Sequence, residues 1–313
     1  MLVFLVRRVT AGLTLVLVIA ALTFAMMGLD GTNAARAVAG ETASREQVAA
    51  KAAELGLDQP VAVRFWDWLT AAVQGDLGRS WFTGETVTST IGNKLPVTLS
   101  IVLGALLLSA LLSTLLGIAA AVRPGALDRL VQSLAVLGFA VPSFLVALVL
   151  AVVVGVKLGW LPATGYVPFA DSPGDWLRSV TLPSVSLAVG AIAATAQQVR
   201  GSMVDVLRTD YVRTLRSRGI SERSLLLRHA LRNAAPAALT VLALQFIGLV
   251  GGAVVVEKVF GLAGVGSEIN TAGSQGDTPM IMGLVVVMVA LVVVVNIVMD
   301  LAYGWLNPKV RVG

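Results

Sequence analysis

The chain alternates between six long runs without charged residues and shorter polar connections. Each run holds at least 21 residues, and its apolar positions cover every side instead of alternating with polar ones. About 20 apolar residues cross a bilayer as a helix, and a backbone in lipid must satisfy its own hydrogen bonds. The pattern predicts an all-α membrane protein with six transmembrane helices. The predicted spans are Val9–Leu29, Leu95–Val122, Leu130–Val156, Ser179–Val199, Asn233–Val256 and Thr278–Met299.

Composition excludes soluble and disordered classes. Hydrophobic residues make up 57% of the chain and charged residues 13%, against about a quarter charged in soluble domains. There is no cysteine, so disulfides and thiolate sites are excluded. A single histidine, His229, cannot form a histidine cluster. The sequence therefore predicts no metal site and no catalytic residue.

The first run also has features of a signal peptide, because Arg7 and Arg8 precede it and small residues follow. Its 21 apolar residues exceed the roughly 7–15 of a signal sequence. We therefore expect an uncleaved first span, with cleavage as the alternative.

Positive charge sets the expected orientation. With the N-terminus inside, 14 of the 23 Lys and Arg residues lie on cytoplasmic connections and 9 outside, six of them in the long segment 30–94. Short cytoplasmic loops carry the excess of Lys and Arg. Both termini are predicted to be cytoplasmic. The same topology explains the basic balance, so no nucleic-acid partner is expected.

The outer segment 30–94 is predicted to be a helical insertion. Arg45–Leu57 is a polar, alanine-rich helix with Ser44 as N-cap and Gly56 as stop signal. Val61–Val73 carries aromatic residues at helical spacing, which is typical of a helix at a membrane interface. The pattern leaves open whether the insertion is a packed cap on the spans or a surface for substrate. The predicted domains are 1–29 (N-terminal tail and first span), 30–94 (outer insertion) and 95–313 (core of the remaining five spans).

The cytoplasmic connection 200–232 is more than a linker. Its 33 residues include eight arginines. The pattern predicts a helix over Met203–Arg218, a break at Gly219-Ile220 and a second helix over Ser221–Leu231. We call residues 200–232 the coupling segment.

The second helix of the coupling segment is predicted to be amphipathic. Ser221 is a suitable N-cap, and Glu222 favours the positive helix end. Such a helix fits a groove on a partner protein or anionic lipid headgroups, and the pattern leaves both open. One side of the helix groups Leu225, Leu226, His229 and Ala230.

This segment resembles the "EAA" loop of ABC importer permeases. Arg213-Thr214-Leu215, Gly219 and, nine residues later, His229-Ala230-Leu231 have its spacing. Arg213 stands in place of the usual Glu, and His229–Ala234 in place of I-x-L-P. These departures are typical of the dipeptide, oligopeptide and nickel permease branch, as is Asp210–Gly219.

The resemblance extends along nearly the whole chain. Asn307-Pro308-Lys309 replaces a commoner Asp-Pro-Arg, and Gly276–Pro279 lacks a frequent Arg. Further segments typical of the branch are Gly56–Pro60, Gly75–Ser80, Leu95–Leu99, Val141–Phe144, Leu158–Tyr166, Glu257–Gly266 and Asn296–Arg311.

The resemblance implies a type I ABC importer permease, the first (B-type) of two permease subunits, which moves peptides across the bacterial cytoplasmic membrane by alternating access. It implies a sister six-span permease, cytoplasmic ATPase subunits that bind ATP and Mg, and an extracytoplasmic peptide-binding protein, either a lipoprotein or periplasmic. Membrane lipids are the remaining expected partner. Its coupling helix falls at Gly219–Arg228. The implied coupling residues are Arg213, Thr214, Leu215, Gly219, Ile220, Ser221, Glu222, Leu225, Leu226 and His229.

The residues themselves support a translocation subunit that is separate from the ATPase subunits. No G-x-x-x-x-G-K-[ST] phosphate loop occurs, so we expect a translocation subunit and not an ATPase. The predicted spans contain no ionisable group, unlike ion-coupled carriers. Asp300, just past the sixth run, is expected to contact a neighbouring helix.

A few positions inside the spans stand out. Gln245 and Asn296 are predicted either to line a translocation path or to bond neighbouring helices. Gly248 and Gly252 predict close helix packing, and Pro142 predicts a kink. Within the same machinery, nickel, glutathione or oligosaccharide remain alternative solutes. A non-transporting scaffold that docks a cytoplasmic partner is the alternative of another class.

Overall fold

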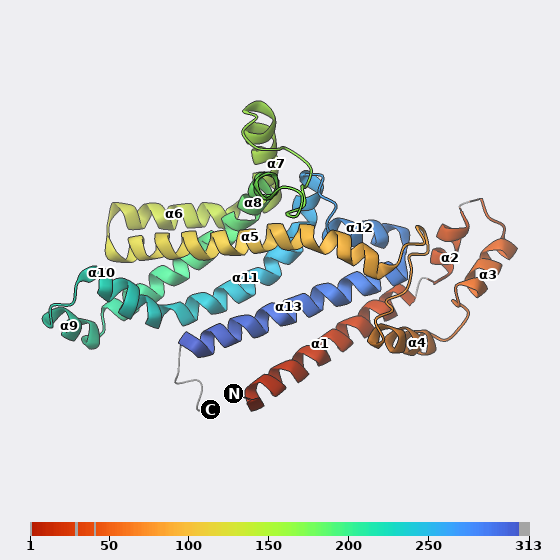
Figure 1. Ribbon diagram of the computed structural model, residues 1–313, viewed down its shortest axis with the longest axis horizontal. Helices are drawn as coiled ribbons and strands as arrows, with labels where there is room; N and C mark the ends of the chain where they lie inside the picture. The colour runs from red at the N-terminus through yellow and green to blue at the C-terminus, as the bar shows by residue number, and fades with distance from the viewer. Residues whose placement is uncertain (1, 29–30, 41, 307–313) are drawn as a thin grey trace. The chain divides into compact units, whose positions relative to one another are not determined.

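The computed structural model describes residues 2–28, 31–40 and 42–306, and the regular structure of these residues is helical apart from one isolated bridge between Arg79 and Thr86 (Figure 1). The predicted all-α class is confirmed. The helices are α1 (Leu2–Gly28), α2 (Gly31–Ala39), α3 (Arg45–Glu54), α4 (Val61–Val73), α5 (Val87–Val122), α6 (Ala126–Ala140), α7 (Ser143–Leu150), the π-helical η1 (Ala151–Lys157), α8 (Pro173–Leu207), α9 (Asp210–Ser217), α10 (Glu222–Ser224), the π-helical η2 (Leu225–Ala230), α11 (Leu231–Val259), α12 (Val265–Gln275) and α13 (Thr278–Leu306).

Five helices are long and apolar enough to cross a membrane, and a sixth span is formed if one bent pair counts as a single crossing. They coincide with the six predicted runs. Most helices extend beyond their run because charged and polar residues continue the helix outside the apolar stretch. The predicted end of the first span, Leu29, lies outside the described residues.

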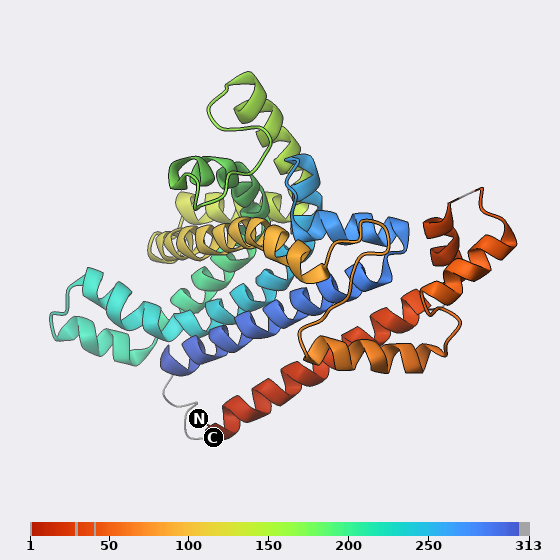
Figure 2. The same ribbon diagram turned by 45° about the vertical axis from the view of Figure 1, so that its right-hand side comes forward.

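The bent pair corrects the predicted third span. Instead of a kinked helix over Leu130–Val156, α6 and the α7–η1 helix meet at 96° (Figures 1 and 2). Val141 is extended, with φ −91° and ψ 117°, and Pro142 occupies the N-cap of α7. Proline lacks the N–H that would continue the α6 ladder and forces the preceding residue out of helical geometry.

The chain forms two compact units, each described by itself. The first comprises residues 1–96 and 263–294, and the second residues 97–262 and 295–313. These units follow packing, whereas the predicted division at residues 29 and 94 follows position relative to a membrane. That division stays a prediction.

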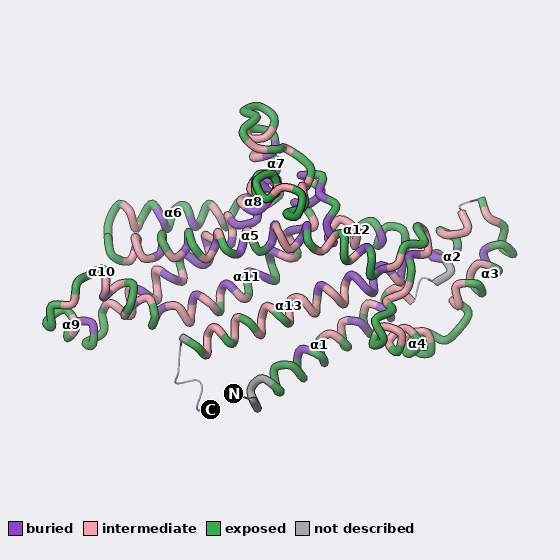
Figure 3. Tube along the Cα trace, viewed as in Figure 1, coloured by how far each residue is buried: buried purple, intermediate pink, exposed green. Residues whose placement is uncertain are grey.

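In the second unit, small residues bring α5, α6 and α8 close together. A Cβ at Gly117 of α5 would lie 2.6 Å from Cβ of Val199. A Cβ at Gly138 of α6 would lie 2.9 Å from Cβ of Ala193. Close approach through small residues is a common way to pack helices in lipid, where the hydrophobic effect between helices is absent. Figure 3 shows the resulting buried bands along α8.

In the first unit, α1 and α13 pack closely. A Cβ at Gly12 would collide with Cγ1 of Val293, so glycine permits this close approach. Further along α1, Ala20 and Phe24 form a buried cluster with Met282 of α13.

A polar cluster in the first unit joins segments far apart in sequence. Asp277, 2% exposed, accepts hydrogen bonds from the Ser80 hydroxyl and from the Trp81 N–H, the latter at 3.3 Å. The Ser80 oxygen in turn accepts from the Thr83 N–H at 3.0 Å. Asp277 thus holds the turn before α5 against the start of α13. Lys94 and Glu268 add an ion pair of 2.8 Å.

The helices of residues 31–86 partly match the predictions. Ser44 caps α3 through a capping box with Gln47, as predicted in position. The helix ends at Glu54, before the expected Leu57, and α4 spans the predicted Val61–Val73. A further short helix rich in alanine, α2, was not predicted from the sequence.

Candidate functional site: the coupling segment

The coupling segment consists of the end of α8, the separate helix α9, and the helix that leads into α11. The predicted helix over Met203–Arg218 is wrong as one element. The helix α8 ends at Leu207, and a separate helix, α9, begins at Asp210. The Arg208 N–H bonds to the Asp205 carbonyl at 3.3 Å, which tightens the last turn of α8.

The predicted second helix is not separate either. From Glu222, the chain runs through η2 into α11 as one 38-residue helix that ends at Val259. Neither glycine nor proline interrupts the step from Ser221 to Ala235, and Pro236 is accommodated inside α11. The short free-standing helix of the segment is therefore α9, which precedes the predicted centre at Gly219–Arg228.

The turn at Gly219 is present and has a defined geometry. Gly219 has φ +76°, its N–H bonds to the Arg216 carbonyl at 2.9 Å, and the Ile220 N–H bonds to the Leu215 carbonyl at 3.2 Å. These two bonds form a Schellman motif, which ends α9 and satisfies its last carbonyls. The left-handed conformation explains why glycine stands at this position.

An ion pair joins the two arms of this turn. The Arg216 guanidinium donates from Nε to Glu222 Oε1 at 2.8 Å. Ser221 occupies the N-cap position, as predicted, but its side chain makes no capping bond. The carboxylate of Glu222 lies in the first helical turn, where the helix dipole favours it, and also pairs with Arg216.

The predicted coupling residues divide into an inner and an outer set. Leu225 is buried and Leu226 and His229 are half-buried on one side of the helix, as the amphipathic pattern predicted. Leu215 and Ile220 are also half-buried. The exposed set is Arg213, Thr214, Gly219, Ser221 and Glu222.

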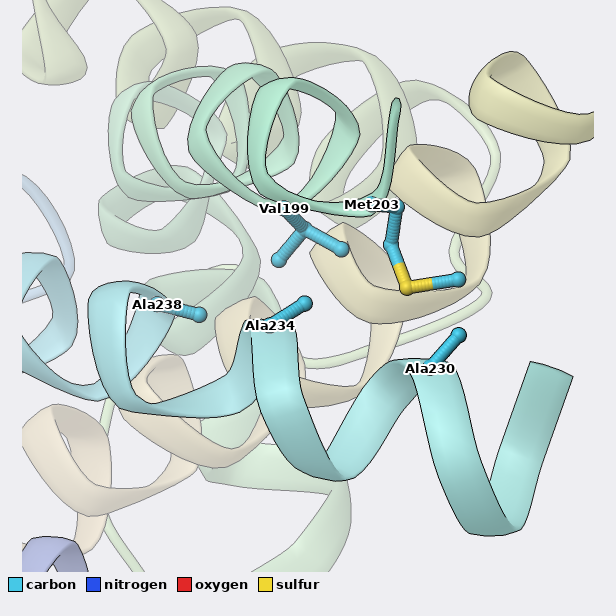
Figure 4. Close-up of a cluster of buried hydrophobic side chains, with 5 residues drawn as sticks. All are labelled: Val199, Met203, Ala230, Ala234 and Ala238. Carbon is cyan, nitrogen blue, oxygen red and sulfur yellow. The ribbon is translucent and has the colours of Figure 1, made fainter. Parts of the chain in front are cut away.

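The base of the segment is a tight contact between α8 and α11. Figure 4 shows Val199 and Met203 of α8 facing three alanines at intervals of four residues. Met203 and Ala230 are fully buried. Side chains four apart lie on one helix face, so this alanine series lets the two helices approach closely. The alanines are Ala230, Ala234 and Ala238.

Hydrogen bonds fix α9 to the start of α11. The Asn233 side-chain amide donates to the Tyr211 hydroxyl at 3.0 Å and to the His229 carbonyl at 2.9 Å. Val212 of α9 is fully buried. Asn233 and Tyr211 were not predicted as site residues, because they lie 22 positions apart along the chain and no local pattern joins them.

A second missed contact anchors the segment to α6. Arg200 donates from Nε and Nη2 to the two carboxylate oxygens of Asp128, with Nη2 to Oδ2 at 2.6 Å. This bidentate geometry is the strong form of an ion pair. Asp128 lies 72 residues away, in the first turn of α6, and no local pattern pointed to it.

The positions singled out inside the spans lie apart from this segment. Gln245 and Asn296 are half-buried, and their predicted role stays a prediction. A Cβ at Gly252 would lie 3.2 Å from Leu187 of α8, so this glycine packs within the chain, whereas Gly248 is exposed. Pro142 is exposed at the α6–α7 break.

The fifth span encloses an ionisable group that the apolar run had excluded. Glu257 lies inside α11, is fully buried and accepts a 2.6 Å hydrogen bond from the Thr98 hydroxyl of α5. The predicted fifth span, Asn233–Val256, contains no ionisable group, and Glu257 is part of the same helix because α11 continues past that apolar run. In the described ranges, no group of three or more His, Asp or Glu side chains is placed to hold a metal ion.

The chain matches known membrane-transport families over most of its length. Residues 113–312 match the family described as binding-protein-dependent transport system inner membrane component, and residues 1–102 match the N-terminal part of such membrane components. A putative peptide transport system permease protein of Brucella abortus is 40% identical over 306 residues, which cover 97% of this chain and 98% of that protein. The chain belongs to this family.

Other relatives agree. A probable peptide ABC transporter permease protein of Sinorhizobium fredii is 33% identical over 99% of both chains. A glutathione transport system permease protein of Salmonella typhimurium is 36% identical over 99% of both chains. The chain is thus a permease subunit of an ABC importer.

Solved structures show the fold. An inward-facing form of the MetNI methionine ABC transporter matches with a TM-score of 0.56 at 18% identity, over 70% of this chain and 96% of the matched chain. At this identity the likeness concerns the fold alone. It confirms the predicted type I ABC importer permease fold.

Proposed function

We propose that this permease imports peptides across a bacterial cytoplasmic membrane, with both termini in the cytoplasm. The observation that carries the proposal is the alignment over 97% of the chain with a peptide transport permease. The excess of Lys and Arg on the connections assigned to the cytoplasm supports this orientation.

The energy is proposed to come from separate ATPase subunits that bind ATP and Mg and dock on the coupling segment. Helix α9 offers the docking surface, since Arg213 and Thr214 are exposed while Val212 anchors the helix. The Arg216–Glu222 pair and the Gly219 turn hold α9 at a set angle to the next helix. Motion of α9 would then reach α11 directly, because α10, η2 and α11 form one helix.

The remaining partners are proposed from the family. A sister six-span permease would complete the translocation path, and exposed apolar residues of α11, such as Leu244 and Ile247, provide surface for a neighbouring helix in addition to lipid. An extracytoplasmic peptide-binding protein would deliver the solute on the side of residues 30–94.

Purification of the tagged chain from its native membrane in mild detergent tests this assembly. We expect a second six-span permease, an ATPase with a phosphate-binding loop and a peptide-binding protein to co-purify. The chain alone, from membranes that contain those proteins, would contradict the assembly and favour a scaffold. Uptake of a radiolabelled oligopeptide by the reconstituted complex, dependent on ATP and the binding protein, tests the solute.

Glutathione is a second candidate solute, because the glutathione permease relative is 36% identical over 99% of both chains. Glutathione is itself a small peptide, so one machinery suits both. Competition in the same uptake assay separates them. Strong inhibition by glutathione and weak inhibition by linear oligopeptides would replace the first proposal with the second.

A further inference from the structure

A pocket lies in the first unit, beside α4. It encloses a cavity of about 290 Å³ between α4, the connection before it, one end of α1 and the start of α13. We call it the α4 pocket. Its lining residues are Phe24, Leu55, Gly56, Gln59, Arg64, Asp67, Trp68, Trp81, Thr278, Pro279 and Met282.

Two residues that line the α4 pocket, Trp68 and Arg64, carry hydrogen-bond donors for which the described residues supply no acceptor. The indole Nε1 of Trp68 is buried without a hydrogen-bond partner in the part of the chain that the structure describes. A buried donor left unsatisfied costs free energy, and such donors are normally paired in native proteins. A ligand oxygen at this position would remove that cost.

The second donor is the guanidinium of Arg64. It lies 5.6 Å above the centre of the Phe24 ring, and no carboxylate of the described residues lies within ion-pair distance of it. Burial lowers the pKa of Arg64 from its ordinary value, but arginine remains a cation in proteins. A half-buried cation beside an unpaired N–H favours an anionic ligand with several oxygen atoms.

The pocket lies where lipid headgroups are expected. Phe24 is near the end of the span α1, and Met282 is near the start of the span α13. On α4, Val63, Trp66 and Val73 are exposed, with Trp66 at 63%. A helix with exposed tryptophan and valine beside the ends of two spans is typical of the membrane interface.

We propose that the α4 pocket binds the headgroup of a phospholipid from the adjacent leaflet. Arg64 and the Trp68 indole N–H donate hydrogen bonds to the phosphodiester oxygens. The side chains of Phe24 and Met282, which are 5% and 0% exposed, form the apolar wall of the pocket behind the headgroup. The Asp67 carboxylate, exposed at the rim, accepts from the ammonium of an ethanolamine headgroup. The identification of this leaflet as the outer one rests on the proposed function, whereas the binding site itself is argued from the contacts above.

Native mass spectrometry of the complete complex in dodecyl maltoside tests the site. The delipidated complex is titrated with phosphatidylethanolamine, and bound lipids are counted. We expect Arg64→Gln to weaken the strongest lipid-binding event about tenfold and Trp68→Phe, which keeps an aromatic ring but removes the N–H, about threefold. Arg45→Gln, an exposed arginine of α3, is the matched control and should leave binding unchanged.

Three outcomes would overturn the proposal. Equal lipid binding by wild type and Arg64→Gln removes the assigned site. Displacement of the lipid by millimolar inorganic phosphate identifies a free-anion site instead. Weaker docking of the binding protein in Arg64→Gln, with lipid binding unchanged, identifies a protein side chain as the occupant. Co-purification of the ATPase in the same sample reports separately on the proposed permease function.

Discussion

The base of the coupling segment and the α4 pocket differ in how tightly their side chains pack. At the base of the coupling segment, Val199 and Met203 lie against alanines, and Met203 and Ala230 have no exposed surface. The α4 pocket combines large aromatic side chains with a cavity of about 290 Å³. Small residues allow two helices to meet without gaps, whereas large aromatic rings from several segments leave space between them at the α4 pocket.

Their polar groups differ in the same way. In the coupling segment Asn233, Tyr211 and Arg216 all have partners within the chain. In the α4 pocket the Trp68 N–H and the Arg64 guanidinium have no acceptor among residues 2–28, 31–40 and 42–306. The base of the coupling segment is therefore closely packed, and its polar anchors are paired within the chain, whereas the α4 pocket combines a cavity with two donors that the described residues leave without an acceptor.

The largest expected effect comes from overfilling the closed contact. Ala234 is 2% exposed and faces Val199 and Met203, so Ala234→Leu has no space for its added atoms. We expect the free energy of unfolding to fall by about 2 kcal/mol, together with a loss of uptake. Thermal unfolding of the purified complex measures the first effect, and Thr240→Leu, at an exposed position of α11, is the control. An unchanged melting temperature in Ala234→Leu would show that this contact is loose.

The second largest effect is expected from a substitution at the Gly219 turn of the coupling segment. At φ +76°, Gly219→Ala places a Cβ in a left-handed conformation that costs about 1–2 kcal/mol. No heavy atom lies within 4 Å of that Cβ, so the effect is conformational and not steric. We expect more ATP hydrolysed per peptide imported, and Gly219→Asn should recover part of the coupling because asparagine tolerates this conformation.

Gly201→Ala is the matched control for this turn. Gly201 is helical and has equally open space around its Cβ position, so alanine should be neutral or stabilising there. Similar ATP-to-peptide ratios for Gly219→Ala and Gly201→Ala would contradict the role assigned to the turn.

Breaking the ion pair between α6 and α8 should have a smaller effect. Asp128→Asn leaves Arg200 without its carboxylate, which should lower the melting temperature by less than Ala234→Leu and reduce uptake. Exchanging the charges in Asp128→Arg with Arg200→Asp should restore part of both. If the double variant is no better than the sum of the single changes, the two residues act independently.

The smallest effect on stability is expected at the α4 pocket. In delipidated protein, Trp68→Phe should change the free energy of unfolding by less than about 0.5 kcal/mol, because removal of the unsatisfied donor offsets the loss of part of the indole ring. Trp68→Ala also removes the ring that stacks on Phe65, with centroids 6.2 Å apart, and should destabilise clearly. A marked loss in the phenylalanine variant, with lipid absent, would mean that the N–H is already satisfied.

Much of the fold could be predicted from local signals. Charge-free runs locate the spans, and the cap at Ser44, the helix Val61–Val73 and the turn at Gly219 all follow from residue types at fixed positions. The failures have a common cause. The extent of a helix depends on what it packs against, so α11 extends past its apolar run and buries Glu257, and α8 stops at Leu207.

Proline shows the same limit. Pro96, Pro183 and Pro236 lie inside continuous helices, while Pro142 stands at a 96° break. In each case the residue lacks an N–H. Neighbouring helices decide whether the helix continues around the missing bond, and a linear sequence does not name those neighbours.

The sequence by itself determined the membrane class, the six apolar runs, the corner at Gly219 and the family, because each depends on residues close together in the chain. Only the tertiary structure decided which distant groups meet. Asp277 bonds to Ser80 across 197 positions, Arg200 to Asp128 across 72, and Asn233 reaches Tyr211 across 22. Such pairs depend on where whole helices cross, and crossings depend on side-chain shape along both helices.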